Sequence, residues 1–135
     1  MLPAGPQALD VLYIEDSTID SVLMELIARR SRCNQIHTVM TAEIGLQLAM
    51  EYRPRLILMD INLPGMDGLQ AVRRLKSDIA TRDIPIIAVS SDDSTELSVR
   101  AYAAGCDDFF AKPLDINKVI STLDQYLRPL HGTVV

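Results

Sequence analysis

Five short apolar runs, separated by amphipathic stretches, most strongly limit how this chain can fold. The runs occupy 10–14, 35–39, 55–59, 84–90 and 107–111. Each has the length of a strand, and the stretches between them carry apolar residues at helical spacing. The central runs are apolar nearly throughout, which is typical of parallel strands buried on both faces. The alternation predicts an α/β protein with a doubly wound five-stranded parallel sheet and flanking helices.

The first stretch between runs predicts a helix that Ser17 and Thr18 can cap. Its apolar positions follow the i, i+3, i+4, i+7, i+8 spacing of one helix face. These positions are Ile19, Val22, Leu23, Leu26 and Ile27.

Four further helices are predicted in the same way. Thr41 can cap the second, and Pro54 prevents its continuation past about residue 52. Gly68 opens the third, whose inward positions are Leu69, Val72 and Leu75. The fourth, from about 93 to 104, is the least amphipathic, so we expect it to be the most mobile element and part of a partner surface. The last helix is marked by Ile116, Val119, Ile120, Leu123 and Leu127.

Composition limits the classes of function. The chain has 13 Lys and Arg against 18 Asp and Glu, a net charge of −5, which argues against nucleic acid as the main partner. No apolar run approaches the roughly 18 residues of a membrane span, and the start has no signal-peptide pattern. Cys33 and Cys106 lack CxxC spacing, which favours reduced thiols in a cytoplasmic protein. We expect one domain over 9–128, between tails at 1–8 and 129–135.

Polar side chains gather where the predicted strands end. Glu15 and Asp16 follow the first run, Asp60 follows the third, Ser90 ends the fourth and Lys112 follows the fifth. In a doubly wound sheet the binding site lies outside the carboxyl ends of the strands, where the strand order reverses. These five residues are therefore expected on one rim of the sheet.

This set of residue types suits phosphoryl transfer. Three close carboxylates repel one another, and oxygen-only ligands suit Mg²⁺ better than Zn²⁺. An ionised Asp60 is a nucleophile that needs no general base. Lys112 and Ser90 can donate to the oxygens of a phosphoryl group.

Each residue, taken singly, has a commoner local explanation. An Asp after a strand is most often a helix cap or a turn former, and acidic pairs and serines also cap helices. A Lys before Pro is usually a surface residue. The joint occurrence of the five residues on one rim is what favours chemistry.

Four motifs make the chain resemble the receiver domains of two-component response regulators, the family that includes the chemotaxis regulators. The resemblance covers about 9–128, and the motifs are VLYIEDS, LILMDINLPGMDG, PIIAVSS and AGCDDFFAKP. It implies a flavodoxin-like (βα)5 fold with strand order 2-1-3-4-5. It also implies a signalling module that catalyses only its own phosphorylation and dephosphorylation, and is otherwise not an enzyme.

The resemblance implies roles for particular residues. Asp60 is the implied phosphoacceptor, receiving its phosphoryl group from a His of a sensor histidine kinase or histidine phosphotransfer protein. Asp16, Asp60 and the backbone carbonyl of Asn62 are the implied direct ligands of Mg²⁺, with Glu15 acting mostly through water. Lys112 is the implied phosphate contact, and its bond to the following proline is implied to be cis.

Ser90 and Phe109 stand at the implied switch positions. The hydroxyl moves toward the phosphoryl group and the aromatic ring rotates inward, which shifts the population of the face formed by the fourth helix, fifth strand and fifth helix. Thr is commoner than Ser at the first position. Phe109 lacks the hydroxyl of a Tyr, so its two states differ by packing alone.

Three functions remain as alternatives. The first is a phosphorylatable receiver that binds a further, unidentified protein. The second is a phosphatase with an aspartyl-phosphate intermediate, although such enzymes usually have a second acid where this chain has Asn62. The third is a scaffold that binds partners without phosphorylation. A stand-alone regulator, a phosphorelay carrier and a domain of a hybrid kinase all remain open, as does homodimerisation.

Overall fold

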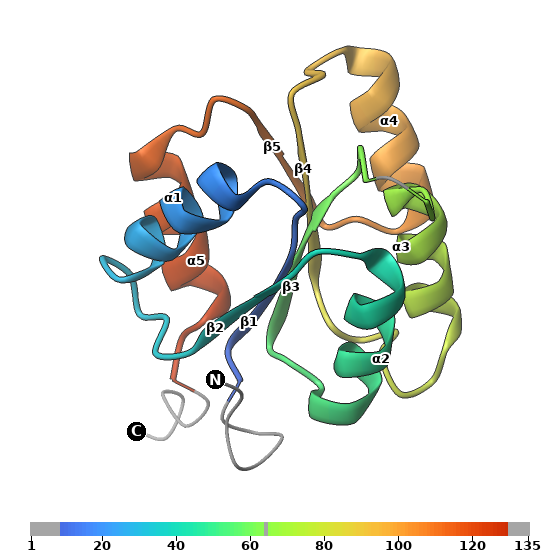
Figure 1. Ribbon diagram of the computed structural model, residues 1–135, viewed down its shortest axis with the longest axis horizontal. Coiled ribbons are helices and arrows are strands. Elements are labelled where there is room, and N and C mark those ends of the chain that lie inside the picture. Colours follow the sequence, from blue (N-terminus) through green and yellow to red (C-terminus); the bar gives the residue numbers. More distant parts are fainter. Residues whose placement is uncertain (1–8, 64, 130–135) are drawn as a thin grey trace.

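Five parallel strands form one sheet at the centre of the molecule (Figure 1). The computed structural model describes residues 9–63 and 65–129. The sheet order is β2-β1-β3-β4-β5, and every neighbouring pair is parallel. The strands are β1 (Val11–Ile14), β2 (Ile36–Val39), β3 (Leu56–Asp60), β4 (Ile86–Ser90) and β5 (Asp108–Ala111). The predicted flavodoxin-like order is confirmed.

Within the described residues, five helices cover the two faces of the sheet. α1 and α5 lie on one side, and α2, α3 and α4 on the other (Figure 1). Their bounds are α1 (Thr18–Ala28), α2 (Ala42–Tyr52), α3 (Gly68–Ser77), α4 (Thr95–Ala104) and α5 (Ile116–Tyr126). Each begins after a polar residue whose side chain accepts a backbone N–H of the first turn. These caps are Ser17, Thr41, Asp67, Ser94 and Asp115.

The period of two along each strand divides the core into two halves. Along β1, Tyr13 packs into the half under α1 and α5, together with Met24 and Phe110. Leu12 and Ile14 pack into the half under α2, α3 and α4. The sheet is thus fixed from both sides, and its strand ends become a rigid rim.

The helix predicted after Ser17 forms, but its predicted face does not enter the core. Of the five apolar positions, only Ile27 is buried, beside Met24 and Ala28. The other four are 38 to 81% exposed: Ile19, Val22, Leu23 and Leu26. The helix has two apolar stripes, and the stripe that contains Met24 packs against the sheet and α5.

The structure also bears on the predictions about one peptide bond, the cysteines, membrane spans and the tails. The Lys112–Pro113 bond is cis, as predicted. Both cysteines are free thiols, and burial raises the pKa of each to about 12. No helix within the described ranges is long and apolar enough to cross a membrane. The predicted tails lie outside the described residues, apart from residue 129.

Candidate functional site

The order of the strands reverses between β1 and β3, and the two strands lie side by side at the middle of the sheet. Glu15 follows β1 directly, and Asp60 is the last residue of β3. Their carboxylates therefore meet at the point where doubly wound folds bind ligands. The helix packing on both faces holds these strand ends in place.

Three carboxylates meet at this rim. One ligand atom from each of Glu15, Asp16 and Asp60 lies within 4.8 Å of the others. Glu15 and Asp60 are 1% and 5% exposed, whereas Asp16 is exposed. Buried acids at this spacing need positive charge beside them. An oxygen-only donor set fits Mg²⁺, which takes few protein carboxylates and keeps several waters.

The Glu15 carboxylate is held by three donors. Its Oε1 accepts the phenol O–H of Tyr13 at 2.7 Å and the ammonium of Lys112 at 2.8 Å. Its Oε2 accepts the backbone N–H of Ser17 at 3.2 Å. Burial, and then the neighbouring Asp60, raise the pKa of Glu15, although the donors from Lys112 and Tyr13 work in the opposite direction.

Lys112 provides the positive charge of the site from the end of β5. Its Nζ lies 2.8 Å from Glu15 Oε1, 2.9 Å from Asp20 Oδ2 and 3.5 Å from Asp60 Oδ2. Burial works to lower the pKa of Lys112, but the bonds to Glu15 and Asp20 outweigh it and raise that pKa. The side chain therefore stays an ammonium, placed beside the Asp60 carboxylate.

Asp20 is a site residue that the sequence pattern does not reveal. It stands in the first turn of α1, where an acid is normally explained by the helix dipole. An acid at this position often accepts the backbone N–H of the helix cap. Here that N–H, on Ser17, donates to Glu15 instead, and the Asp20 side chain turns to Lys112.

Asn62 connects Asp60 with Ser90. Its backbone N–H donates to Asp60 Oδ1 at 2.9 Å, and its side-chain amide donates to Ser90 Oγ at 3.0 Å. Ser90 is fully buried and also accepts the backbone N–H of Asp92 at 3.0 Å. The predicted hydroxyl residue is thus joined to the carboxylates through an amide side chain whose role the sequence does not indicate.

Gly68 allows α3 to begin close against the end of β3. A Cβ at Gly68 would lie 2.5 Å from the Cα of Ile61 and 2.7 Å from the carbonyl oxygen of Asp60. Both are backbone atoms, which cannot move aside without moving the strand end. Glycine at the start of α3 is therefore required for the position of Asp60.

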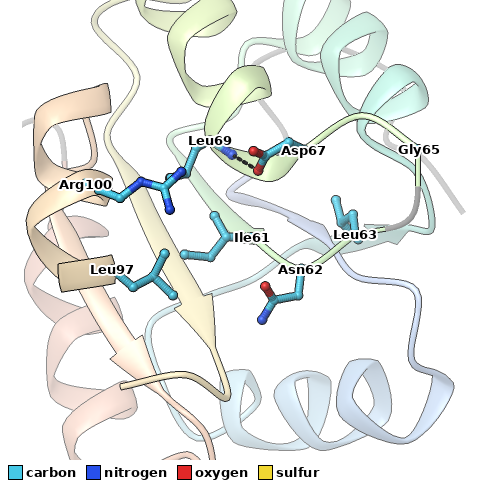
Figure 2. Close-up of a pocket in the computed structure, with 8 residues that line it drawn as sticks. All are labelled: Ile61, Asn62, Leu63, Gly65, Asp67, Leu69, Leu97 and Arg100. Carbon is cyan, nitrogen blue, oxygen red and sulfur yellow. Dashed lines mark hydrogen bonds between the residues drawn. The ribbon is translucent and has the colours of Figure 1, made fainter. Parts of the chain in front are cut away.

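A pocket of about 370 Å³ lies between the β3–α3 loop and α4. In Figure 2, Leu97 and Arg100 of α4 face Ile61 and Leu69 across it. Asn62 lines the same pocket. The pocket therefore lies between α4 and the end of β3, where Asn62 follows Asp60.

Phe109 lies away from the carboxylates. It is half-buried on β5, opposite Ala88 of β4, and packs against the core half under α2, α3 and α4 together with Leu97. The next residue, Phe110, is buried on the other face. The structure thus joins Glu15, Asp60 and Lys112 directly and places Phe109 outside that group.

The sequence profile described as "Response regulator receiver domain" matches residues 11–124. The chain belongs to this family. Receiver domains accept a phosphoryl group in two-component signalling from a histidine kinase or phosphotransfer partner, and they are not conventional enzymes. The family that the four motifs predict is confirmed.

Curated relatives support this assignment, and solved structures share the fold. The polar-differentiation response regulator DivK of Brucella anthropi is 36% identical over 117 residues, which cover 87% of this chain and 94% of that protein. A putative response regulator of Chloroflexus aurantiacus aligns with a TM-score of 0.82 at 21% identity, covering 90% of this chain and 98% of that one.

A third similar protein was solved with a metal. The receiver domain of a sensor histidine kinase of Pseudomonas aeruginosa has a magnesium ion coordinated in its active site cleft. It aligns with a TM-score of 0.79 at 26% identity, covering 91% of this chain and 98% of that one. Its fold and that of this receiver domain are therefore alike over nearly the whole of both chains.

Proposed function

We propose that Asp60 is the phosphoacceptor of this receiver domain and that Glu15, Asp16 and Asp60 hold Mg²⁺, with the backbone carbonyl of Asn62 as a further ligand. The observation that carries the proposal is the ammonium of Lys112, 3.5 Å from Asp60 Oδ2, beside the three clustered carboxylates. Mg²⁺ bound there would offset the repulsion among the carboxylates and neutralise charge on a phosphoryl group.

The residues of the chain have separate tasks in the transfer. Asp60 Oδ forms a bond to phosphorus while the bond between phosphorus and the donor's histidine nitrogen breaks, and the electron pair stays on that nitrogen. The N–H of Asn62 holds one Asp60 oxygen and so orients the other. Lys112 donates to one phosphoryl oxygen, and the Ser90 hydroxyl donates to another.

Ser90 and Phe109 form the switch in this proposal. Ser90 Oγ accepts from Asn62 and Asp92, so its movement toward a phosphoryl group breaks two hydrogen bonds. Phe109 is half-buried beside α4 and gains burial when it rotates inward. Phosphorylation thereby shifts the population of the face formed by α4, β5 and α5, which binds the downstream protein.

We infer that the exposed apolar face of α1 docks the histidine protein that donates the phosphoryl group. This α1 face consists of Ile19, Val22, Leu23 and Leu26. It begins within four residues of Glu15, and Asp20 of the same turn contacts Lys112. A protein that covers this face brings its histidine to the rim that holds Asp60.

The proposal extends to the domain bounds, the class of target and the location of the protein. Residues 9–128 form the receiver domain, with 1–8 and 129–135 as tails. The net charge of −5 supports a protein target rather than nucleic acid. A histidine kinase as partner and two free thiols support a cytoplasmic location in this proposal, and homodimerisation would use the same face of α4, β5 and α5.

Incubation with acetyl phosphate and Mg²⁺, followed by intact mass measurement, tests the proposal. The wild-type chain should gain the mass of one phosphoryl group, and Asp60→Asn should gain none. Asp67→Asn is the matched control because Asp67 lies in the same loop and an Asn can still cap α3. Unchanged mass for the wild type, or equal phosphorylation of Asp60→Asn, would overturn the assignment.

A further inference from the structure

Tyr13 carries a polar atom into an otherwise apolar part of the core. Its side chain is fully buried in the half under α1 and α5. The ring packs there with Met24, Phe110 and Leu123, contacts that a Phe would make equally well. The phenol O–H donates to Glu15 Oε1 at 2.7 Å. This hydrogen bond is therefore what distinguishes Tyr from Phe at the position.

The donors around Glu15 leave little freedom in how its carboxylate is turned. A carboxylate has about four acceptor positions, two on each oxygen. On Oε1, Tyr13 and Lys112 occupy both. On Oε2, the Ser17 N–H occupies one. Oε2 has only this one backbone donor, so it is the oxygen with more room for the cation or for a water bound to it.

The two donors to Oε1 differ in how firmly they are held. The Tyr13 ring is fixed by the packed core around it, whereas the Lys112 ammonium ends a flexible four-carbon stem. In the proposed transfer, Lys112 turns toward a phosphoryl oxygen. The phenol then remains as the donor that holds Oε1 in place.

We propose that Tyr13 is a positioning residue of the metal site, whose buried phenol orients the Glu15 carboxylate for binding of the cation or of a water bound to it. This inference rests on the proposed function, because it assumes that Glu15 belongs to the magnesium site. Tyr13 itself touches neither the cation nor the phosphoryl group. It acts only through Glu15.

Titration of the unphosphorylated protein with Mg²⁺, followed by backbone amide NMR signals, tests the proposal. Tyr13→Phe keeps the ring and removes only the hydroxyl, and it should raise the Kd for Mg²⁺ about tenfold, as loss of a partner that orients a ligand typically does. Tyr52→Phe is the matched control, because it removes a phenol hydroxyl from a half-buried residue of α2. That variant should keep the wild-type Kd.

A second comparison separates orientation of Glu15 from a general effect on the fold. In a Glu15→Ala background, Tyr13→Phe should change the Kd by less than about twofold, since no carboxylate remains to be oriented. An unchanged Kd in Tyr13→Phe alone, or the same tenfold loss in both backgrounds, would overturn the role of Tyr13. Failure of the wild type to bind Mg²⁺ would instead overturn the proposed function.

Discussion

At the scale of single residues, the buried carboxylates that serve the proposed phosphoryl transfer also lower the stability of the metal-free protein. Glu15 and Asp60 are buried side by side, and both burial and Asp60 raise the pKa of Glu15. A raised carboxyl pKa means that its contribution to stability is present below the ordinary value of 4.5 and is lost as the pH rises through the raised value. The metal-free protein therefore carries electrostatic strain at neutral pH.

Neutralising Asp60 should relieve this strain. We expect Asp60→Asn to raise the free energy of unfolding of the metal-free protein by more than about 0.5 kcal/mol, the range within which remote surface substitutions usually fall, because it removes one of two buried like charges. Urea unfolding at neutral pH with a chelator measures it. Asp83→Asn, at an exposed residue remote from the rim, should change stability by less than about 0.5 kcal/mol. A less stable Asp60→Asn protein would contradict the interpretation.

The affinity for Mg²⁺ should fall in mildly acidic solution. Because the pKa of Glu15 is raised, protonation begins at a higher pH than for an ordinary carboxyl and removes an acceptor from the site. Binding should weaken as the pH falls from neutral toward 4.5, the ordinary value. NMR titrations at several pH values measure this, and Glu15→Gln should have a flatter profile. Identical profiles for both proteins would count against the role of Glu15.

The residues that carry charge could be predicted from the sequence, but their partners could not. Asp60 ends a strand, Glu15 and Lys112 directly follow strands, and a parallel sheet brings these strand ends together. Tyr13 has the pattern of an ordinary core residue, because its hydrogen bond depends on two side chains sharing one face of β1. Asp20 has the pattern of a helix-dipole acid until the fold brings Lys112 beside the first turn of α1.

At the scale of elements, α1 shows that apolar spacing alone does not predict which face of a helix is buried. Two apolar stripes satisfy the spacing rule, and only the stripe with Met24 and Ile27 is buried. Four of the five residues that the spacing favoured stay exposed. The other helix faces were predicted better, since α3 buries Leu69, Val72 and Leu75 as expected.

Charge placed on the α1 face should slow transfer from a protein donor. We expect Val22→Lys to reduce the rate of transfer from a phosphorylated histidine phosphotransfer protein about tenfold, which corresponds to roughly 1.4 kcal/mol. Phosphorylation by acetyl phosphate should be unchanged. Val99→Lys on α4 is the matched control, because Val22 and Val99 are 49% and 59% exposed. Equal slowing by both variants would show that α1 is not the docking face.

α4 should be the least protected helix. Its buried residues are two alanines, Ala101 and Ala104, whereas α3 buries five residues. Little buried apolar area leaves little free energy against local opening. Hydrogen exchange measured by NMR should therefore be fastest in α4 among the five helices, and slower exchange in α4 than in α3 would refute the expectation.

At the scale of the whole molecule, the two proposed working surfaces are centred on helices from opposite faces of the sheet. α1 lies on one side of the sheet and α4 on the other (Figure 1). The rim with Asp60 lies between them, at the ends of β1 and β3. In the proposed function, the donor approaches over α1 and the response appears at α4, β5 and α5. The alternation of strands and helices predicted a sheet with helices on both faces. The partner that each surface binds depends also on the surface of that partner.

In the proposed function, this rim makes Asp60, rather than any neighbouring carboxylate, the acceptor of the phosphoryl group. Borohydride reduction of the phosphorylated protein, followed by peptide mass mapping, locates the acyl phosphate directly. We expect modification of Asp60 alone, and only when Mg²⁺ is present during phosphorylation. Modification of Asp16 or Asp67 in place of Asp60, or phosphorylation that is equally fast without Mg²⁺, would contradict it.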